Sequence, residues 1–296
     1  MLDRLGVRTF ALLAVGVCAV SLAAPLMAHL VVPALAIAFW RNAFATAGLT
    51  PVVVVRRRAE LAGLSRSDLV ATGIAGLCLA AHFGFWITSL RMTSVASSTA
   101  IVSLQVIWVL GWDLARGVAV PRRVLLGVAV ATAGALVVSG IDLSLSARAL
   151  AGDGLALVGS VAVAAYAVIG GRVRQRVSTT TYTTGAYGVA ALALLVAALA
   201  AGQDLGGYAG SQWVWLLVLT ATAQLLGHSV FNHLLATVTP TVVSLALLLE
   251  IPGAALIAGV WLDQVPGWGA VAGLALILGG MTLVVLNEPE LSTAPA

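Results

Sequence analysis

The chain has 296 residues, of which 61% are hydrophobic and 9% are charged. Its mean hydropathy of +1.08 lies far above that of soluble domains, so the composition excludes a soluble enzyme or a soluble binding module. The formal net charge is +4, and all 15 basic side chains are arginines. Because they lie mainly between apolar runs, we interpret them as topology signals and predict no nucleic-acid partner.

Apolar runs of membrane-spanning length follow one another along the chain. A helix needs about 20 largely apolar residues to cross the hydrocarbon layer, and the runs lack the alternation of a β-barrel strand. We therefore predict an all-α polytopic membrane protein with ten transmembrane helices. Their ranges are Thr9 to Val31, Ala34 to Val55, Leu69 to Leu90, Thr93 to Ala115, Arg122 to Ser139, Gly152 to Arg172, Thr181 to Ala201, Gln212 to Leu234, Thr241 to Leu262 and Trp268 to Leu286.

The arginines predict how these helices are oriented. If the N-terminus is cytoplasmic, twelve arginines fall in cytoplasmic segments, while Arg91 and Arg148 fall outside. Such a positive-inside bias predicts that both termini are cytoplasmic, in a multi-pass protein of the bacterial inner (plasma) membrane. Arg41 lies inside the second helix. Two interpretations stay open for it: its side chain snorkels toward the outer interface, or it serves an anionic substrate.

The two halves of the sequence resemble each other at a shift of about 145 residues. The superposed pairs are Gln105 and Glu250, Pro121 and Pro266, Gly134 and Gly279, and, at almost the same shift, His82 and His228. The alternative is chance similarity between apolar segments, which the matching polar pairs and prolines disfavour. Five helices in each half would make the second half enter the membrane upside down, an arrangement typical of transporters. We predict repeats over residues 1–145 and 146–290, followed by a disordered tail over 291–296.

Prolines and glycines inside the spans have their own expected roles. Pro25 and Pro252 free backbone carbonyls, so we expect a kink at each. Glycines in the last helix are interpreted as close-packing positions, since neither a strand nor a cytosolic helix start accompanies them as in a phosphate-binding loop. These glycines are Gly269, Gly273, Gly279 and Gly280.

Several short motifs are shared with a known transporter family. They are Ala38-Phe-Trp-Arg41, Val95-Ala-Ser-Ser-Thr-Ala100, Phe231-Asn232, Val238-Thr-Pro240 and Leu249-Glu250-Ile-Pro252-Gly253. In these motifs the chain resembles the EamA-type transporters of the drug/metabolite transporter superfamily. The resemblance implies ten helices in two inverted five-helix repeats, a central cavity, and export of small metabolites or drugs. The chain departs from the pattern at Leu262-Asp263, where members often have Gly-Glu, and at Val106, where a proline is usual.

Polar and aromatic side chains within the spans are the candidates for a substrate site. A charge in the middle of a span is costly and usually faces protein or water, so Glu250, with His228 as a second candidate, is predicted to bind the coupling proton. Polar residues at helical spacing favour a cavity, and hydrogen bonds between helices are the alternative. The predicted substrate-binding residues are His82, Trp86, Gln105, Trp108, Tyr166, Gln224, His228, Asn232 and Glu250.

These features predict a secondary-active transporter that exports a small organic metabolite or drug by alternating access. An uncoupled facilitator or gated pore is the alternative. We predict no enzyme activity, no cofactor and no metal site, because the spans contain no pairing of a nucleophile with a base and no metal-ligand cluster. The expected partners are a small-molecule substrate and membrane lipid, with the chain acting as a monomer or homodimer.

Overall fold

The computed structural model describes residues 2–141, 146–263 and 267–286, and within these ranges the chain is helical with no strand. The α-helical elements and one π-helix, η1, are α1 (Leu2–Ser21), α2 (Ala23–His29), α3 (Ala34–Arg56), α4 (Arg58–Ala62), α5 (Arg66–Ser89), α6 (Val95–Val102), α7 (Gln105–Ala115), α8 (Arg122–Ile141), α9 (Ala147–Val173), α10 (Thr179–Ala200), α11 (Gly210–Leu219), η1 (Thr220–His228), α12 (Ser229–Leu234), α13 (Pro240–Leu247), α14 (Glu250–Trp261) and α15 (Trp268–Leu286).

The described helical segments include seven that are long and apolar enough to cross a membrane. The predicted all-α, polytopic class is confirmed at this level. The seven segments are Val7–His29, Arg66–Ser89, Val95–Ala115, Ala147–Val173, Thr179–Ala200, Gly210–Leu234 and Pro240–Trp261. The predicted pairing of Pro121 with Pro266 and the tail over 291–296 fall outside the described residues.

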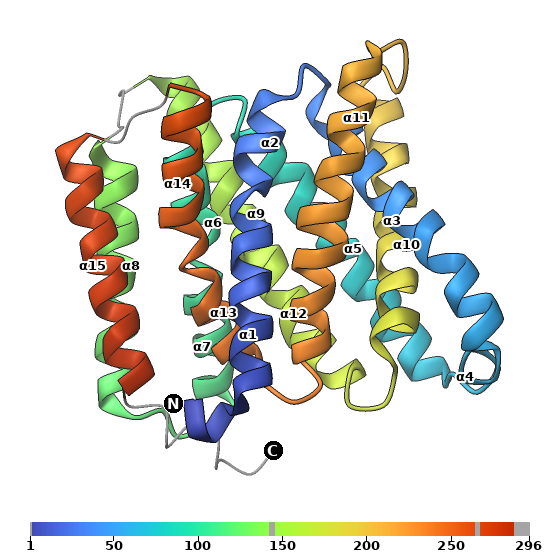
Figure 1. The fold of residues 1–296 in the computed structure, drawn as a ribbon, viewed down its shortest axis with the longest axis horizontal. Helices are drawn as coiled ribbons and strands as arrows, with labels where there is room; N and C mark the ends of the chain where they lie inside the picture. Colours follow the sequence, from blue (N-terminus) through green and yellow to red (C-terminus); the bar gives the residue numbers. More distant parts are fainter. Residues whose placement is uncertain (1, 142–145, 264–266, 287–296) are drawn as a thin grey trace.

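The long segments stand side by side, and successive segments run in opposite directions (Figure 1). α1 begins and α15 ends at the lower edge of this view, whereas α11 begins at the upper edge. The most extensive helix pairs are α8 with α15, α5 with α9, and α3 with α10. The largest buried apolar cluster combines residues of α2, α3, α5, α10 and η1, so the helices enclose a protein interior in which polar groups can be held away from lipid.

Two of the predicted helices break where a proline explains the break. α1 ends at Ser21 and α2 begins at Ala23; Pro25 lacks the N–H that would bond the carbonyl of Ser21. Pro252 likewise cannot bond the carbonyl of Leu248, which is the C-cap of α13 immediately before α14. The expected kinks at Pro25 and Pro252 therefore lie one helical turn upstream of each proline.

The predicted span from Thr93 to Ala115 corresponds to the apolar segment Val95–Ala115, which is broken inside. α6 ends at Val102, and α7 starts at Gln105. No proline accounts for this break. The hydroxyls of Ser89 and Ser98 hydrogen-bond each other just beside it, so α6 is anchored to the end of α5.

Helix starts recur at a nearly constant interval along the chain. The pairs that lie 145 residues apart are Leu2 and Ala147, Ala34 and Thr179, Val95 and Pro240, and Gln105 and Glu250. The starts of α5 and α11, and those of α8 and α15, differ from this interval by one residue. The break between α6 and α7 therefore has a counterpart, 145 residues later, between α13 and α14.

Glycines allow α8 and α15 to approach closely. A Cβ atom added at Gly134 would lie 2.6 Å from the carbonyl oxygen of Gly273, and one added at Gly280 would lie 2.5 Å from that of Gly127. Close packing was expected for Gly273 and Gly280, and the structure agrees. Gly279 has no atom within 4 Å of an added Cβ, so the close-packing expectation was wrong for that residue.

Candidate functional site

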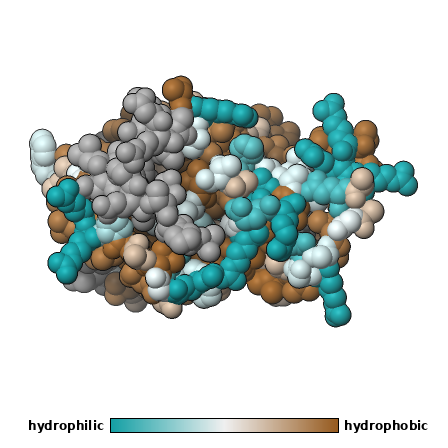
Figure 2. Space-filling model, turned by 90° about the horizontal axis from the view of Figure 1, so that it is seen from below, coloured by the Kyte–Doolittle hydropathy of each residue, from teal (hydrophilic) through white to brown (hydrophobic). Residues whose placement is uncertain are grey.

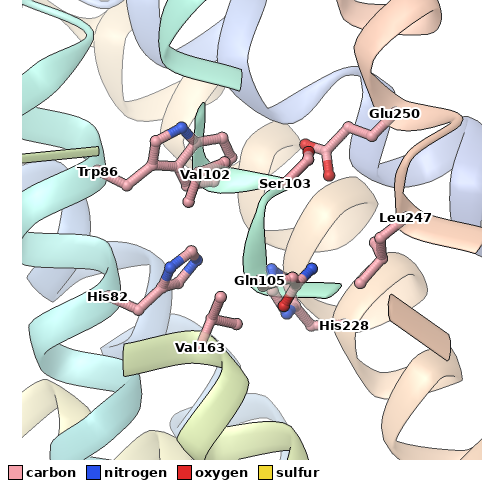
Figure 3. A pocket seen from close by; sticks show the side chains of 9 residues that line it. All are labelled: His82, Trp86, Val102, Ser103, Gln105, Val163, His228, Leu247 and Glu250. Atoms are coloured by element: carbon pink, nitrogen blue, oxygen red, sulfur yellow. The ribbon is translucent and has the colours of Figure 1, made fainter. Parts of the chain in front are cut away.

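An interior cavity of about 30 Å³ lies beside two helix breaks, the one between α6 and α7 and the one between α13 and α14. Its walls come from α5, α6, α7, α9, η1, α13 and α14 and from Ser103 in the break between α6 and α7 (Figure 3). The lining residues are His82, Trp86, Val102, Ser103, Gln105, Val163, His228, Leu247 and Glu250. A water molecule needs about 10–15 Å³ of such space, so the cavity can hold water or a small chemical group but is too small for a whole metabolite.

Many of the lining residues are related by the sequence shift between the two halves. The pairs are Val102 with Leu247, Gln105 with Glu250, and His82 with His228. The first two pairs are 145 residues apart, and the histidines are 146 apart. Each half thus contributes one aliphatic side chain, one amide or carboxyl side chain and one imidazole to the same small space.

The imidazole of His82 is fixed by one hydrogen bond and one ring contact. Its Nδ1 lies 3.1 Å from the carbonyl oxygen of Gly159 on α9, and a carbonyl can only accept, so Nδ1 carries a hydrogen. The ring stacks on Trp86 at a centroid distance of 5.3 Å, and it lies 6.4 Å from the ring of His228. In a neutral His82 the other nitrogen, Nε2, is therefore the acceptor.

Gln105 and Glu250 each begin a half-helix beside a break, α7 and α14. Both are buried, and the Oε1 atom of each has no hydrogen-bond partner among the described residues. Leaving a buried polar atom unpaired costs about 1–3 kcal/mol. Two such atoms in one cavity indicate that a water or ligand normally satisfies them.

Three predicted site residues lie in a separate buried polar cluster beside η1. Gln224 is hydrogen-bonded to Arg41 and Asn42 on α3. Asn232 accepts a hydrogen bond of 2.9 Å from the hydroxyl of Tyr166 on α9. These contacts match the alternative interpretation, hydrogen bonding between helices, for Gln224, Tyr166 and Asn232.

The π-helix explains why the expected stripe on the eighth span does not stay together. Gln224, His228 and Asn232 stand four residues apart and would share one face of a regular α-helix. η1 covers residues 220–228, and its wider turn changes the register of the side chains. His228 therefore lines the cavity while Gln224 and Asn232 contact α3, α9 and α10.

Trp108 also lies outside the cavity. Its side chain is 41% exposed, and its Nε1 donates a hydrogen bond of 2.8 Å to Ser160 on α9. On the next turn of α7, the ring of Trp112 faces the guanidinium of Arg172, whose Cζ lies 5.3 Å from the ring centroid. The aromatic stripe of α7 thus packs along α9, and only Gln105, at the start of the helix, reaches the cavity.

The sequence left two interpretations open for Arg41, and the structure shows its surroundings. It is fully buried, and its Nε donates a hydrogen bond of 2.8 Å to Gln224. Its Nη1 lies 3.3 Å from the sulfur of Met27, and its Cζ lies 4.0 Å from the ring centroid of Phe83. The interpretation that Arg41 snorkels to the outer interface was wrong, because its side chain is held in the interior.

Sequence reasoning missed the apolar and hydroxyl lining of the cavity. Val102, Ser103, Val163 and Leu247 line it beside the polar residues. The repeat could have indicated two of these residues. Val102 and Leu247 each lie three residues before the matched residues Gln105 and Glu250, so the same shift relates them. Val163, on α9, has no such signal in the sequence.

Polar contacts join the two halves on the lower side, where α4 lies (Figure 1). Glu60 accepts a hydrogen bond of 2.6 Å from the backbone N–H of Ser178, and Arg176 forms a 2.7 Å ion pair with Asp68. The hydroxyl of Thr241 donates to Asp113 near the end of α7. Partial burial alone would raise the pKa of Glu60, but its hydrogen bonds from Ser178 lower the pKa below the ordinary value.

A different set of contacts joins the two halves on the upper side, where α11 begins (Figure 1). The backbone N–H of Val31 donates to Gln212 at 2.8 Å, and Trp40 Nε1 donates to the carbonyl of Leu205 at 2.9 Å. His29 stacks on Trp261 at a centroid distance of 4.7 Å. The two halves are therefore in contact at both ends of the helices.

Comparison with known proteins connects this arrangement to a family. A model of the EamA-like transporter family matches residues 150–286.

This part of the chain belongs to the EamA-like transporter family.

The EamA-like match covers the second half of the chain, including His228 and Glu250. Together with the apolar helices, the match supports a multi-pass membrane protein, and the matched family is one of the drug/metabolite transporter superfamily, as the sequence motifs predicted. No curated protein matches the chain.

Solved structures share the fold of nearly the whole chain. Among the 29 matching chains is one described only as "Crystal structure of protein", with a TM-score of 0.73 and 18% sequence identity. The alignment covers 96% of this chain and 99% of that one. At this identity the likeness establishes the fold alone.

Among the described residues of the EamA-like chain, no three or more His, Cys, Asp or Glu side chains are grouped as a metal site would require. The two histidines of the cavity are accompanied by the single carboxyl group of Glu250. Within the described residues, His82, His228 and Glu250 do not form such a group.

Proposed function

We propose that this EamA-like protein is a secondary-active carrier that exports a small organic metabolite or drug through its central cavity. One observation carries the proposal: an interior cavity lined by equivalent residues from both halves of the chain. Transporters built from repeats place the substrate site near the membrane midplane, between the repeats. The family is one of transporters, and we propose no catalytic role for the lining residues.

The proposed architecture is ten membrane crossings in two inverted repeats, residues 1–145 and 146–290. The constant interval between helix starts supports the repeat. The direction of the helices supports the inversion, because α3 and α10, equivalent by sequence, run in opposite directions (Figure 1). α3, α8 and α15 would supply the crossings beyond the seven segments that qualify by length and apolarity.

The proposed orientation places both termini in the cytoplasm of a bacterium, with the chain in the inner membrane. Hydrophilic side chains gather on the lower face, where α4 and the adjoining ends of α3 and α5 lie (Figure 2). The arginines of these elements include Arg56, Arg57, Arg58 and Arg66. The positive-inside rule assigns such a face to the cytoplasm.

Alternating access follows from the two sets of closing contacts. In our proposal the lower contacts around Glu60 and Asp68 separate while the upper contacts hold, and the reverse occurs in the other half of the cycle. One repeat rocks against the other around the cavity. The breaks before Gln105 and Glu250 are places where the half-helices can tilt without breaking a continuous hydrogen-bond ladder.

We further propose that Glu250 binds a coupling proton, with His228 as its partner in the cavity. A carboxyl group buried in a membrane-spanning segment is costly when ionised, and its Oε1 has no partner among the described residues. Both features favour a group that gains and loses a proton as its surroundings change. If the Glu250→Gln variant still coupled transport to a pH gradient, this assignment would be wrong.

An uncoupled facilitator or gated pore is the second candidate function. The smallness of the cavity supports this candidate less than it supports a carrier, because a carrier must pass through a state closed on both sides. The two differ in energetics. A pore never moves its solute uphill, whereas a coupled carrier accumulates it.

The function can be tested in two steps. A thermal-shift screen of the purified protein against a metabolite library identifies compounds that stabilise the folded state. Each hit is then loaded into proteoliposomes with and without a pH gradient. We expect uphill movement in the wild type and its loss in His228→Ala, with Gln175→Ala on the exposed lower side as a control. Flux that only follows the solute gradient would favour the facilitator.

A further inference from the structure

Arg41 places a positive charge behind the wall of the cavity. It lies within electrostatic range of His82 on α5, Tyr187 on α10, His228 on η1 and Glu250 on α14. The ring of Phe83, which lies 4.0 Å from the guanidinium carbon, also contacts His228 at a centroid distance of 5.3 Å. One side chain therefore separates the guanidinium from a residue that lines the cavity.

This charge is not neutralised by direct contact. Arg41 forms no salt bridge among the described residues, and its Nη2 atom has no hydrogen-bond partner there. Arginine stays protonated in proteins, and an unpaired buried charge is costly enough that buried charges are normally paired. The neutral partners Gln224 and Met27 orient the guanidinium but bring no negative charge.

Two sources of negative charge can approach Arg41 in this arrangement. One is Glu250, which interacts with Arg41 electrostatically without forming an ion pair. The other is a solute that enters the cavity. The remaining titratable groups that face Arg41 carry no negative charge in their ordinary states: the two imidazoles are neutral or cationic, and the phenol of Tyr187 is neutral.

We propose that the cavity receives an anionic group of the substrate, of carboxylate type, attracted by the charge of Arg41. This inference rests on the proposed function, because it specifies what the transported solute presents to the central cavity. The size of the cavity, about 30 Å³, suits a carboxylate-sized group, with the rest of the solute admitted when one side opens. Arg41 acts through the field it creates, and the lining residues His228 and Gln105 each have an N–H group that can donate a hydrogen bond to the anion.

Glu250 and the anion then compete for the same positive field. An ionised Glu250 repels the incoming anion, whereas a protonated Glu250 does not and can donate a hydrogen bond. The anion and one proton on Glu250 together add no net charge, so their joint movement is electroneutral. Net export then follows when the outward gradient of the anion exceeds the opposing proton gradient.

Opposite effects of two substitutions test this inference. The probes are acetate, its neutral isostere acetamide, and methylammonium, each titrated by thermal shift on the full-length purified protein at constant ionic strength. We expect acetate to stabilise the wild type in a saturable manner and acetamide and methylammonium to do so at least tenfold more weakly. Arg41→Gln should weaken acetate binding at least tenfold, and Glu250→Gln should strengthen it severalfold.

Two further variants keep the test independent of folding defects. Arg41→Lys retains the charge and loses the geometry toward Gln224, so it should bind acetate better than Arg41→Gln. Arg91→Gln removes a different partly buried arginine, one that binds the carbonyls of Leu30 and Val32, and should leave acetate binding unchanged. If Arg41→Gln does not fold, acetate binding by Arg41→Lys and its strengthening in Glu250→Gln still decide the outcome.

The inference is overturned if methylammonium binds in place of acetate, if Glu250→Gln abolishes binding of acetate, or if Arg41→Gln leaves it unchanged. These results do not bear on transport itself. A carrier that moves a cationic or neutral solute uphill in liposomes would contradict the anionic group and leave the proposed function intact. Saturable acetate binding without any transport would support the anionic group and contradict the proposed function.

Discussion

At the scale of single residues, the interior is organised by one amide and one guanidinium. Gln224 Oε1 accepts from Arg41 at 2.8 Å, while its Nε2 donates to Asn42 Oδ1 at 3.2 Å. Two consecutive residues of α3 thus bind both ends of the amide. Because Gln224 belongs to η1, this contact joins the first half of the chain to the element that carries His228.

Removing the amide should therefore be costly. Gln224→Leu leaves the Nε of Arg41 without its partner, and hydrogen bonds to charged groups are worth about 1.5–3 kcal/mol. We expect a clear drop in the thermal unfolding temperature in detergent. Gln224→Glu keeps an acceptor for Arg41 and should lose less stability. Equal loss in both variants would show that packing, and not the bond to Arg41, accounts for the effect.

Glu60 predicts a pH dependence on the lower side. Its folded-state pKa is lowered, so its stabilising contribution is fully present above the ordinary value of 4.5 and is lost as the pH falls through the folded-state value. Unfolding temperatures of the wild type and Glu60→Gln should differ near pH 7 and converge below pH 4.5. A gap that stays constant down to acid pH would contradict the ionised contact with Ser178.

At the scale of elements, the sequence predicted long apolar helices well because apolarity over about 20 residues is a strong signal. It predicted the first or last residue of most spans within a few residues. For example, α3 begins at Ala34 and α8 begins at Arg122, as predicted. It did not predict the break at Ser103, where no proline interrupts the pattern, or the π-helix at Thr220–His228. Both depend on tertiary contacts that local pattern does not encode.

The candidate site was predicted in part for the same reason. Five of the nine proposed side chains line one cavity: His82, Trp86, Gln105, His228 and Glu250. The pairs Gln105 with Glu250 and His82 with His228, which matched between the halves, all lie at this cavity, because the repeat carries information about three-dimensional position. Trp108 and Gln224 were chosen on helical spacing alone, and their helices turn these side chains toward α9 and α3.

Close contact between α8 and α15 gives a prediction at this scale. Gly134→Ala and Gly273→Ala each place a methyl group about 2.6 Å from a backbone oxygen of the other helix, so the helices must separate, at a cost of about 1–3 kcal/mol. Gly279→Ala is the matched control, because its Cβ meets nothing within 4 Å. We expect lower unfolding temperatures for the first two variants and no change in the unfolding temperature of the control. Comparable losses in all three would place the cost in helix propensity or lipid contact.

At the scale of the whole molecule, the account makes the cavity the one point that both sides of the membrane reach in turn. Contacts join the two halves on the upper and lower sides, and those on the lower side include the Glu60–Ser178 hydrogen bond and the Asp68–Arg176 ion pair. Weakening the lower set should favour the state open to the cytoplasm by mass action between conformations. Neither set alone determines the resting state.

The most direct test is the labelling of Ser103→Cys, a position on the cavity wall, in a protein whose Cys18 and Cys78 have been replaced by alanine. A membrane-impermeant thiol reagent is applied to vesicles of each orientation. The account predicts slow labelling from both faces, and Glu60→Gln with Arg176→Ala should accelerate labelling from the cytoplasmic face alone. Labelling from one face only, whatever the variant, would contradict alternating access through this cavity.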